Sequence, residues 1–183
     1  MILEYGAPTD LNMRAPRECE TYTLLDGLGI EYGRVDHAPA DTMEICRGIE
    51  DVLGAHICKN LFLCNRQQTD FYLLMMPGDK PFRTKELSSQ IGSSRLSFAT
   101  PEHMKRYLGL APGSVSVLGL RNDTEGRVRL LIDEELLTEW WIGCHPLVNT
   151  TTLRLRTADL LSCVLPAVKH DYSPVRLFGG GEQ

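Results

Sequence analysis

The sequence predicts an α+β fold in which helices surround a mixed, largely antiparallel sheet. Short apolar runs rich in Val, Ile, Leu and Phe are interspersed along the chain with segments of helical periodicity. Two of these runs are separated by only a short polar break, which is typical of a hairpin. Because 183 residues suit one domain, we expect an irregular lead-in over 1–16, one domain over 17–178 and a flexible tail over 179–183.

The domain is predicted to begin with a helix, a strand and a second helix. Pro16 suits the first turn of the first helix, and Gly29 can end it. A short strand follows over 31–37. Thr42 can cap the next helix, over 42–54, whose apolar residues fall on one face.

The predicted hairpin joins a strand over 56–65 to a strand over 71–77. After it, the pattern predicts in chain order a helix over 84–92, a strand over 95–100, a helix over 101–109 and a structured loop over 111–123. Three strands follow, over 127–132, 140–143 and 151–156. A helix over 157–167, capped by Thr157, and a closing strand over 174–178 complete the domain.

Composition and motifs exclude several functional classes. No apolar run reaches the length of about eighteen residues that a membrane span needs, and the N-terminus lacks the basic start and long apolar core of a secretory signal. The six cysteines form no CxxC pair, and no HExxH, P-loop or GxGxxG motif is present. We therefore expect a cytoplasmic protein that uses neither a metal nor a cofactor.

Charge is segregated along the chain. The net charge of −5 argues against broad, non-specific binding of nucleic acid, which needs a basic face. Residues 79–106 nevertheless hold six Lys or Arg against three acids, whereas residues 122–140 hold six acids against two arginines. A solvated face explains such runs more often than a ligand does, but a local contact with one RNA end remains compatible with them.

The first candidate site is the pair Lys59 and Asn60, in the middle of the first hairpin strand. Alternation puts the two side chains on opposite faces of the strand. An inward ammonium needs a partner, because an unpaired buried charge costs several kcal/mol or more. No carboxylate is close in sequence, so Lys59 either faces solvent or meets a distant or external anion.

Two further segments carry polar groups. In APGSVSVLG, residues 111–119, small side chains leave backbone N–H groups accessible to a carbonyl or an oxyanion. In GCHPLVNTTT, residues 143–152, Pro146 biases His145 toward an extended conformation, and Asn149 with three threonines adds hydrogen-bonding groups. The chain shows no nucleophile in a GxSxG setting.

Five motifs, in this order and spacing, resemble those of the YbaK/ProRS-editing-like superfamily: GAHICKNLFL, SRLSFATPE, LAPGSVSVLGL, RVRLLIDEELL and GCHPLVNTTTLRL. Within it they are most similar to the free-standing prolyl-tRNA editing proteins of the ProX type, and the resemblance spans about residues 17–178. It implies hydrolysis of mischarged Ala-tRNA(Pro). Alanine is smaller than proline, so a synthetic pocket for proline cannot exclude it, and a second, smaller pocket is needed to remove it.

The resemblance also implies a role for each matching residue. Lys59 would hold the 3′-terminal nucleotide at its phosphate, and Asn60 would orient the substrate. Backbone N–H groups of Gly113, Ser114 and Val115 would face the ester carbonyl. His145 would line the alanine pocket or orient the attacking water.

Three more residues belong to the implied substrate-binding set. Arg95 is a candidate for contact with the acceptor stem, and Gly143 and Asn149 flank His145 in its motif. Two positions depart from the family pattern: Val117 stands where a proline is usual, and Cys144 replaces a more usual apolar residue, often aromatic.

The expected partners are the acceptor end of mischarged tRNA(Pro) and prolyl-tRNA synthetase, with a monomer and a homodimer both open. Two alternative functions remain at this point. One is a deacylase for another misacylated tRNA, such as Cys-tRNA(Pro). The other is a non-catalytic module that binds a tRNA 3′ end.

Overall fold

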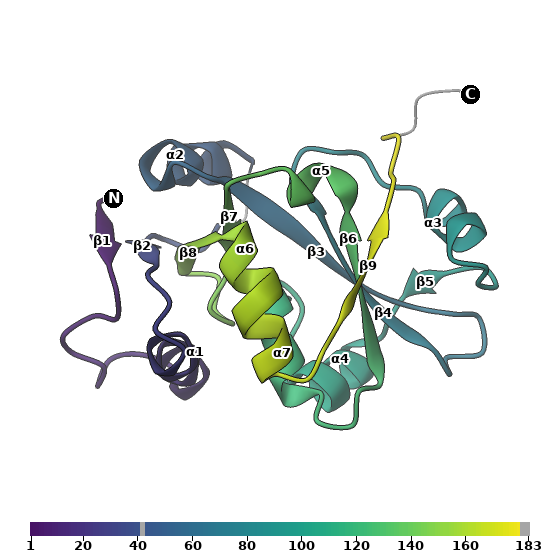
Figure 1. Ribbon diagram of the computed structural model, residues 1–183, viewed down its shortest axis with the longest axis horizontal. Coiled ribbons are helices and arrows are strands. Elements are labelled where there is room, and N and C mark those ends of the chain that lie inside the picture. Colours follow the sequence, from purple (N-terminus) through teal and green to yellow (C-terminus); the bar gives the residue numbers. More distant parts are fainter. Residues whose placement is uncertain (41–42, 180–183) are drawn as a thin grey trace.

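The computed structural model describes residues 1–40 and 43–179, and Figure 1 shows their arrangement. In this part of the chain nine strands form one sheet. Eight of them run in the spatial order β1 (Leu3–Tyr5), β2 (Gly33–Asp36), β8 (Thr151–Arg156), β7 (Trp141–Cys144), β3 (His56–Cys64), β4 (Phe71–Pro77), β6 (Val128–Asp133) and β9 (Tyr172–Val175), and β5 (Ser97–Phe98) pairs with β3.

The pairing confirms the predicted fold class. The neighbours β3–β7, β4–β6 and β6–β9 are parallel, and the other five described pairings are antiparallel. The predicted hairpin is β3–β4, with Lys59 opposite Met76 and Asn60 opposite Met75. The sheet is therefore mixed and largely antiparallel.

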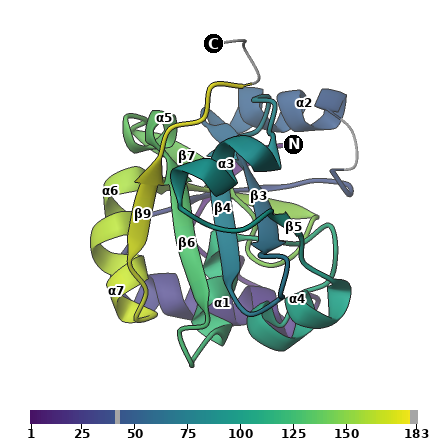
Figure 2. The ribbon, with the colours of Figure 1, turned by 90° about the vertical axis from the view of Figure 1, so that its right-hand side faces the viewer.

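Helices cover both faces of this sheet (Figures 1 and 2). The helical segments are α1 (Pro16–Gly27), α2 (Met43–Leu53), α3 (Thr84–Gln90), α4 (Pro101–Leu108), a 3-10 helix (Val117–Asn122), α5 (Glu134–Leu137), α6 (Thr157–Asp159), a π-helical turn (Leu160–Val164) and α7 (Leu165–Ala167). None of the described helices is long and apolar enough to cross a membrane.

Alternation along β4 separates the core into two sides. Phe71, Leu73 and Met75 belong to the main core, which α1, α4 and the segment from α6 to α7 cover. Their neighbours Tyr72 and Leu74 face the opposite side, where α3 closes one small cluster. A second small cluster on that side lies beneath α2.

The two small clusters leave a gap between them on β3. Ile57 belongs to the cluster under α2, and Leu63 belongs to the cluster under α3. Lys59 lies between these two residues on the same face of the strand, because residues two apart share a face. The layer of helices is thus interrupted beside a lysine.

Several expectations about individual elements need correction. The lead-in over 1–16 is not wholly irregular, because Leu3–Tyr5 pairs with β2 as an edge strand. The helix expected over 157–167 is interrupted by a π-helical turn, and Thr157 is its first residue rather than its cap. Thr42 and residues 180–183 of the predicted tail lie outside the described residues.

Other boundaries shift because tertiary contacts decide them. The strand expected over 95–100 shortens to Ser97–Phe98, because it pairs only with Leu63 and Cys64. The last strand begins at Tyr172, where its parallel pairing with β6 begins. Helix α5, which Asp133 caps at the backbone N–H of Glu135, was not predicted.

Candidate functional site

Lys59 is half-buried and faces a cavity of about 390 Å³. This cavity, called here the Lys59 cavity, lies among α2, β3, the end of β4 and α5. The Lys59 ammonium donates a hydrogen bond to the backbone carbonyl of Lys80, 3.2 Å away. Among the described residues no carboxylate forms an ion pair with Lys59. Lys59 is therefore neither fully exposed to solvent nor paired with a carboxylate of the described residues.

Charges around the Lys59 cavity are of both signs. Lys80 Nζ binds Asp133 Oδ2 at 2.6 Å and Glu135 Oε2 at 2.9 Å, so these two carboxylates are already paired. Carboxylates of α2 and of the α5 region also line the cavity, at Glu50 and Glu139. An ammonium has three donors, and Lys59 uses one of them inside the protein. The cavity can accordingly receive a ligand that carries both an anionic and a cationic group.

Asn60 lies on the opposite face of β3, as alternation predicts. Its Nδ2 donates to the carbonyl of Cys58 at 3.3 Å. Its Oδ1 is buried and has no hydrogen-bond partner among the described residues. Asn60 does not line the Lys59 cavity, so the two predicted neighbours reach different sides of the sheet.

His145 follows the end of β7 and is held by the strand that comes next. Its Nδ1 lies 3.1 Å from the backbone carbonyl of Thr151. A carbonyl oxygen only accepts, so Nδ1 carries the proton in the neutral ring and Nε2 keeps a free lone pair. Burial lowers the pKa of His145 below its ordinary 6.5, and nearby His37 lowers it further, against the opposing effect of the Thr151 carbonyl. At neutral pH the ring is a neutral base.

His37 was not singled out from the sequence. Its ring lies edge-on to that of His145, with 6.5 Å between the centroids. Its Nδ1 lies 2.7 Å from the Ala38 carbonyl and its Nε2 lies 2.9 Å from Thr152 Oγ1. The only sequence signal was its place at the end of a predicted strand, because its contacts with His145 and Thr152 join residues more than a hundred positions apart.

A partly buried ion-pair network fixes the strand that holds His145. Arg14 binds Asp36 through two contacts, Nη1–Oδ1 at 2.8 Å and Nη2–Oδ2 at 2.5 Å. Thr151 Oγ1 donates to Asp36 Oδ1 at 2.9 Å, and Arg34 also pairs with this carboxylate. Burial raises the pKa of Asp36, but the hydrogen bonds from Arg14, Thr151 and Arg34 outweigh it and hold the pKa well below its usual range. The lead-in thus takes part in holding the His145 support in place.

Gly143 lets β7 approach β3 closely. The two strands are parallel, with Gly143 paired to Ile57, so His145 and Lys59 each lie two residues beyond a paired position. A Cβ at Gly143 would lie 3.0 Å from the His56 carbonyl oxygen and 3.1 Å from Leu53 Cδ2. These contacts supply a packing reason for a glycine that the family resemblance places in the substrate-binding set.

Replacing Gly143 with Ala is expected to destabilise the fold by about 1–3 kcal/mol, because the added methyl group forces β7, β3 and α2 apart. Thermal unfolding followed by circular dichroism measures this. Gly27→Ala is the matched control: its Cβ meets nothing within 4 Å, so it should leave the melting temperature unchanged or raise it slightly. Equal melting temperatures for the two variants would contradict the packing role.

The turn at Gly113, Ser114 and Val115 offers fewer donors than the sequence implies. Gly113 is exposed with φ +86°, a conformation that favours glycine. The Ser114 N–H already donates to the Ala111 carbonyl at 3.2 Å, and its Oγ does so at 2.9 Å. The N–H groups of Gly113 and Val115 have no partner among the described residues, so these two are the candidates for a ligand oxygen.

Of the remaining predicted residues, Arg95 is exposed beside β5. Asn149 is half-buried, and its backbone carbonyl accepts a hydrogen bond from the Ala40 N–H at 3.3 Å. Val117 begins the 3-10 helix, which Ser116 caps at the Leu118 N–H at 3.3 Å, so the loop is ordered without a proline. Cys144 is fully buried in the main core, and burial raises the pKa of its thiol to about 12. That thiol is a packing group and not a nucleophile.

Comparison with known proteins identifies the family. The pattern of the aminoacyl-tRNA editing domain matches residues 37–163. The prolyl-tRNA editing protein ProX of Acetoanaerobium sticklandii is 35% identical over 136 residues, which cover 74% of this chain and 83% of that protein. A prolyl-tRNA synthetase associated domain-containing protein 1 from Danio rerio is 32% identical over 157 residues, 85% of this chain and 82% of that protein.

A solved structure reported for a candidate trans-editing enzyme for prolyl-tRNA synthetase shares the fold. Its TM-score is 0.65 at 18% identity, and the match covers 89% of this chain and 97% of that one. The editing-domain match spans more than half of this chain, and two relatives exceed 30% identity over most of their length. The chain therefore belongs to the aminoacyl-tRNA editing domain family and is a trans-editing aminoacyl-tRNA deacylase.

Proposed function

We propose that this deacylase hydrolyses the ester of Ala-tRNA(Pro), and that Lys59 holds the 3′ end of the tRNA while it does so. The observation that carries the proposal is the Lys59 ammonium, half-buried, open to a cavity and unpaired with any described carboxylate. The tRNA end supplies the anion that the chain lacks. The name of the ProX relative supports tRNA(Pro) as the tRNA concerned.

In this proposal Lys59, His145 and the turn over 113–115 divide the chemistry, and the last two contribute from outside the lining of the Lys59 cavity. Lys59 binds a phosphate oxygen of the terminal nucleotide, which brings the ester into range. Water attacks the carbonyl carbon, and His145 Nε2 takes the proton that the water loses. The N–H groups of Gly113 and Val115 stabilise the oxyanion. The bond from the carbonyl carbon to the ribose oxygen then breaks, and that oxygen takes the proton from His145 Nε2. The products are free alanine and tRNA.

The mixed charge of the Lys59 cavity fits this substrate. An aminoacylated RNA end carries phosphates and, a few bonds away, the α-ammonium group of its amino acid. The lysine suits the first, and the carboxylates of Glu50 and Glu139 suit the second. We propose further that the enzyme acts in the cytoplasm, on tRNA charged by prolyl-tRNA synthetase.

Deacylation of Ala-tRNA(Pro) and Cys-tRNA(Pro), measured side by side with the wild-type protein, tests the substrate. We expect alanine to be released faster than cysteine, because the site is proposed to recognise the smallest side chain. Faster release of cysteine would show that the amino-acid assignment is wrong. If both esters survive while the tRNA binds, the protein is a binding module and not an editing enzyme.

A salt titration of tRNA binding tests how much of the tRNA is held. A site limited to the 3′ end touches few phosphates, so the slope of log affinity against log salt should be shallow, about −1 to −3. A slope implying many phosphates would contradict binding through the 3′ end.

A further inference from the structure

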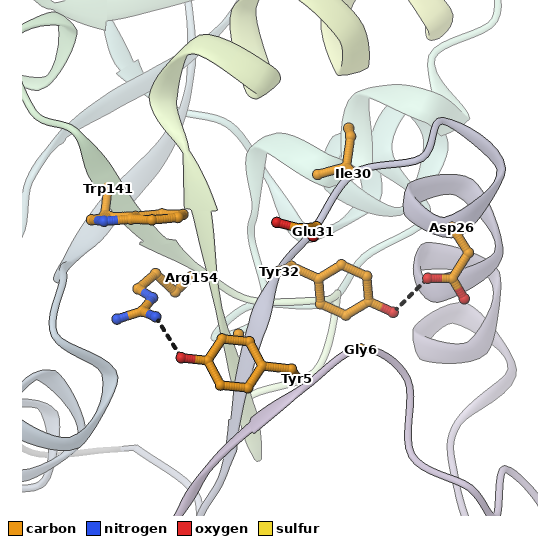
Figure 3. A pocket seen from close by; sticks show the side chains of 9 residues that line it. Tyr5, Gly6, Asp26, Ile30, Glu31, Tyr32, Trp141 and Arg154 are labelled. Carbon is orange, nitrogen blue, oxygen red and sulfur yellow. Dashed lines mark hydrogen bonds between the residues drawn. The ribbon is translucent and has the colours of Figure 1, made fainter.

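A second cavity, of about 550 Å³, lies away from the Lys59 cavity, between β1, β2, β7, β8 and the end of α1 (Figure 3). Its walls include the rings of Tyr5, Tyr32 and Trp141, and Arg154 reaches in between two of them. Its volume suits a ligand of the size of a nucleotide. The editing reaction as proposed makes no use of this cavity.

Arginine and aromatic side chains alternate in a row that begins in this cavity with Tyr5, Arg154 and Trp141 and continues outside it with Arg156 and Trp140. Arg154 lies over Trp141 at 4.8 Å and over Tyr5 at 6.0 Å from the ring centroids. Arg156 lies over Trp141 at 5.4 Å and over Trp140 at 5.9 Å. These five residues form an arginine–aromatic ladder on a protein whose net charge is −5. Interleaved cations and rings are the surface that unpaired bases and phosphates bind.

Arg154 is fixed in place before any ligand arrives. Its Nη1 donates to the Leu53 carbonyl at 2.8 Å, and its Nη2 donates to the Tyr5 hydroxyl at 3.3 Å. Both of its cross-strand partners are glycines, Gly33 and Gly143, so neither neighbouring strand places a side chain directly opposite Arg154. Its Nε is buried and has no partner among the described residues.

The aromatic residues at the two ends of the ladder, Tyr5 and Trp140, are open to a ligand. Tyr5 and Trp140 are 71% and 70% exposed, far more than large aromatic residues usually are. Across the cavity from Arg154, the Asp26 carboxylate accepts the Tyr32 hydroxyl at 3.1 Å, and Glu31 is exposed (Figure 3). The cavity thus presents stacking surfaces and the Arg154 cation at one end and carboxylate acceptors at the other.

We infer that the arginine–aromatic ladder and its cavity bind an unpaired nucleotide of RNA, with the base stacked on the rings and a phosphate against Arg156. The acceptors Asp26 and Glu31 favour a base with an exocyclic amino group, such as adenine or cytosine. The inference rests on the proposed function for the source of this RNA, which is the tRNA substrate.

The position of the ladder is compatible with that source. A smaller cavity shares Trp141 with the ladder cavity, and it shares Glu50, His56 and Glu139 with the Lys59 cavity. Arg154 and Lys59 lie on the face of the sheet that α2 covers, since Arg154 bonds to the last residue of α2 and Lys59 follows Ile57 beneath it. The smaller cavity thus links the ladder cavity to the Lys59 cavity on one face of the sheet.

Tryptophan fluorescence reports on this site directly, because both tryptophans of the chain, Trp140 and Trp141, belong to the ladder. Titration of the full-length protein with uncharged tRNA(Pro) should quench the signal saturably. AMP and CMP should compete with the tRNA, and UMP should compete less well. Tyr5→Ala should weaken tRNA binding about fivefold or more, and Arg156→Ala should make the salt slope shallower by about 1.

Two controls separate this inference from the proposed function. Lys59→Ala should keep the quench even if deacylation is lost. Phe178→Ala removes another exposed ring, outside the ladder, and should change neither the quench nor the affinity. No quench at saturating tRNA would overturn the inference, and so would unchanged affinity in both Tyr5→Ala and Arg156→Ala. Quenching by prolyl-tRNA synthetase and not by RNA would assign the ladder to a protein partner and also overturn it.

Discussion

Lys59→Ala is expected to lower kcat/KM for alanine release from Ala-tRNA(Pro) by about a hundredfold or more, through lost positioning of the ester. The Lys59 ammonium lines the Lys59 cavity from β3, and Arg47 of α2 is a second cation in the lining. Removing the Lys59 ammonium leaves the substrate phosphate without its cation, while the fold loses one hydrogen bond, to the Lys80 carbonyl. Single-turnover deacylation at saturating enzyme measures the effect on the chemical step.

Lys85→Ala is the matched control for this result. Lys85 is exposed on α3, and its removal changes the net charge by the same amount without touching the cavity. We expect its rate to stay within about twofold of the wild type. A Lys59→Ala variant that melts like the wild type and deacylates as fast would remove Lys59 from the site.

His145→Ala is expected to lower the rate by about a hundredfold, the usual contribution of one positioned general base. The effect should depend on pH. The pKa of His145 lies below 6.5, so the ring is a neutral base at pH 7 and becomes protonated only as the pH falls through that lowered pKa. In the wild type, log kcat/KM should therefore be flat near pH 7 and fall at acid pH, with an inflection below 6.5. The variant should lose this inflection.

Asp36→Asn tests how His145 is positioned. Asp36 does not touch His145 but holds Thr151, whose carbonyl accepts the His145 Nδ1 hydrogen bond. Weakening this support should lower kcat more than it raises KM and should move the acid inflection. His103→Gln, on α4, is the control and should keep the wild-type profile. For the His145→Ala prediction above, an acid inflection that persists in the variant would show that a group other than His145 gives the pH dependence.

The sequence predicts those elements of the fold that carry strong local signals. Proline at the first turn places α1 and α4, and the polar break after β3 places the hairpin. The missed elements carry no such signal. Strand β1 has three residues, too few for a periodicity, and forms only because β2 offers it an edge. The π-helical turn replaces a regular helical pattern that the sequence alone favours.

The candidate site is predicted only in part, for a related reason. Strand alternation alone separates Lys59 from Asn60, and the structure places them on opposite faces. Strand alternation does not predict the residues that support His145, because Arg14, Asp36 and Thr151 are up to 137 positions apart in the sequence and contact one another only in the fold. Likewise, a glycine-rich loop shows that N–H groups are accessible, but not that Ser114 already uses its own.

The rate of amino-acid release from Ala-tRNA(Pro) and from Pro-tRNA(Pro), compared on the same tRNA with the wild-type protein, tests the central claim most directly. The two substrates differ only in the amino acid, so the ratio isolates the proposed editing selectivity from tRNA binding. We predict rapid release of alanine and no release of proline above the uncatalysed rate. Release of proline at a rate equal to that of alanine, or release of neither, would contradict it.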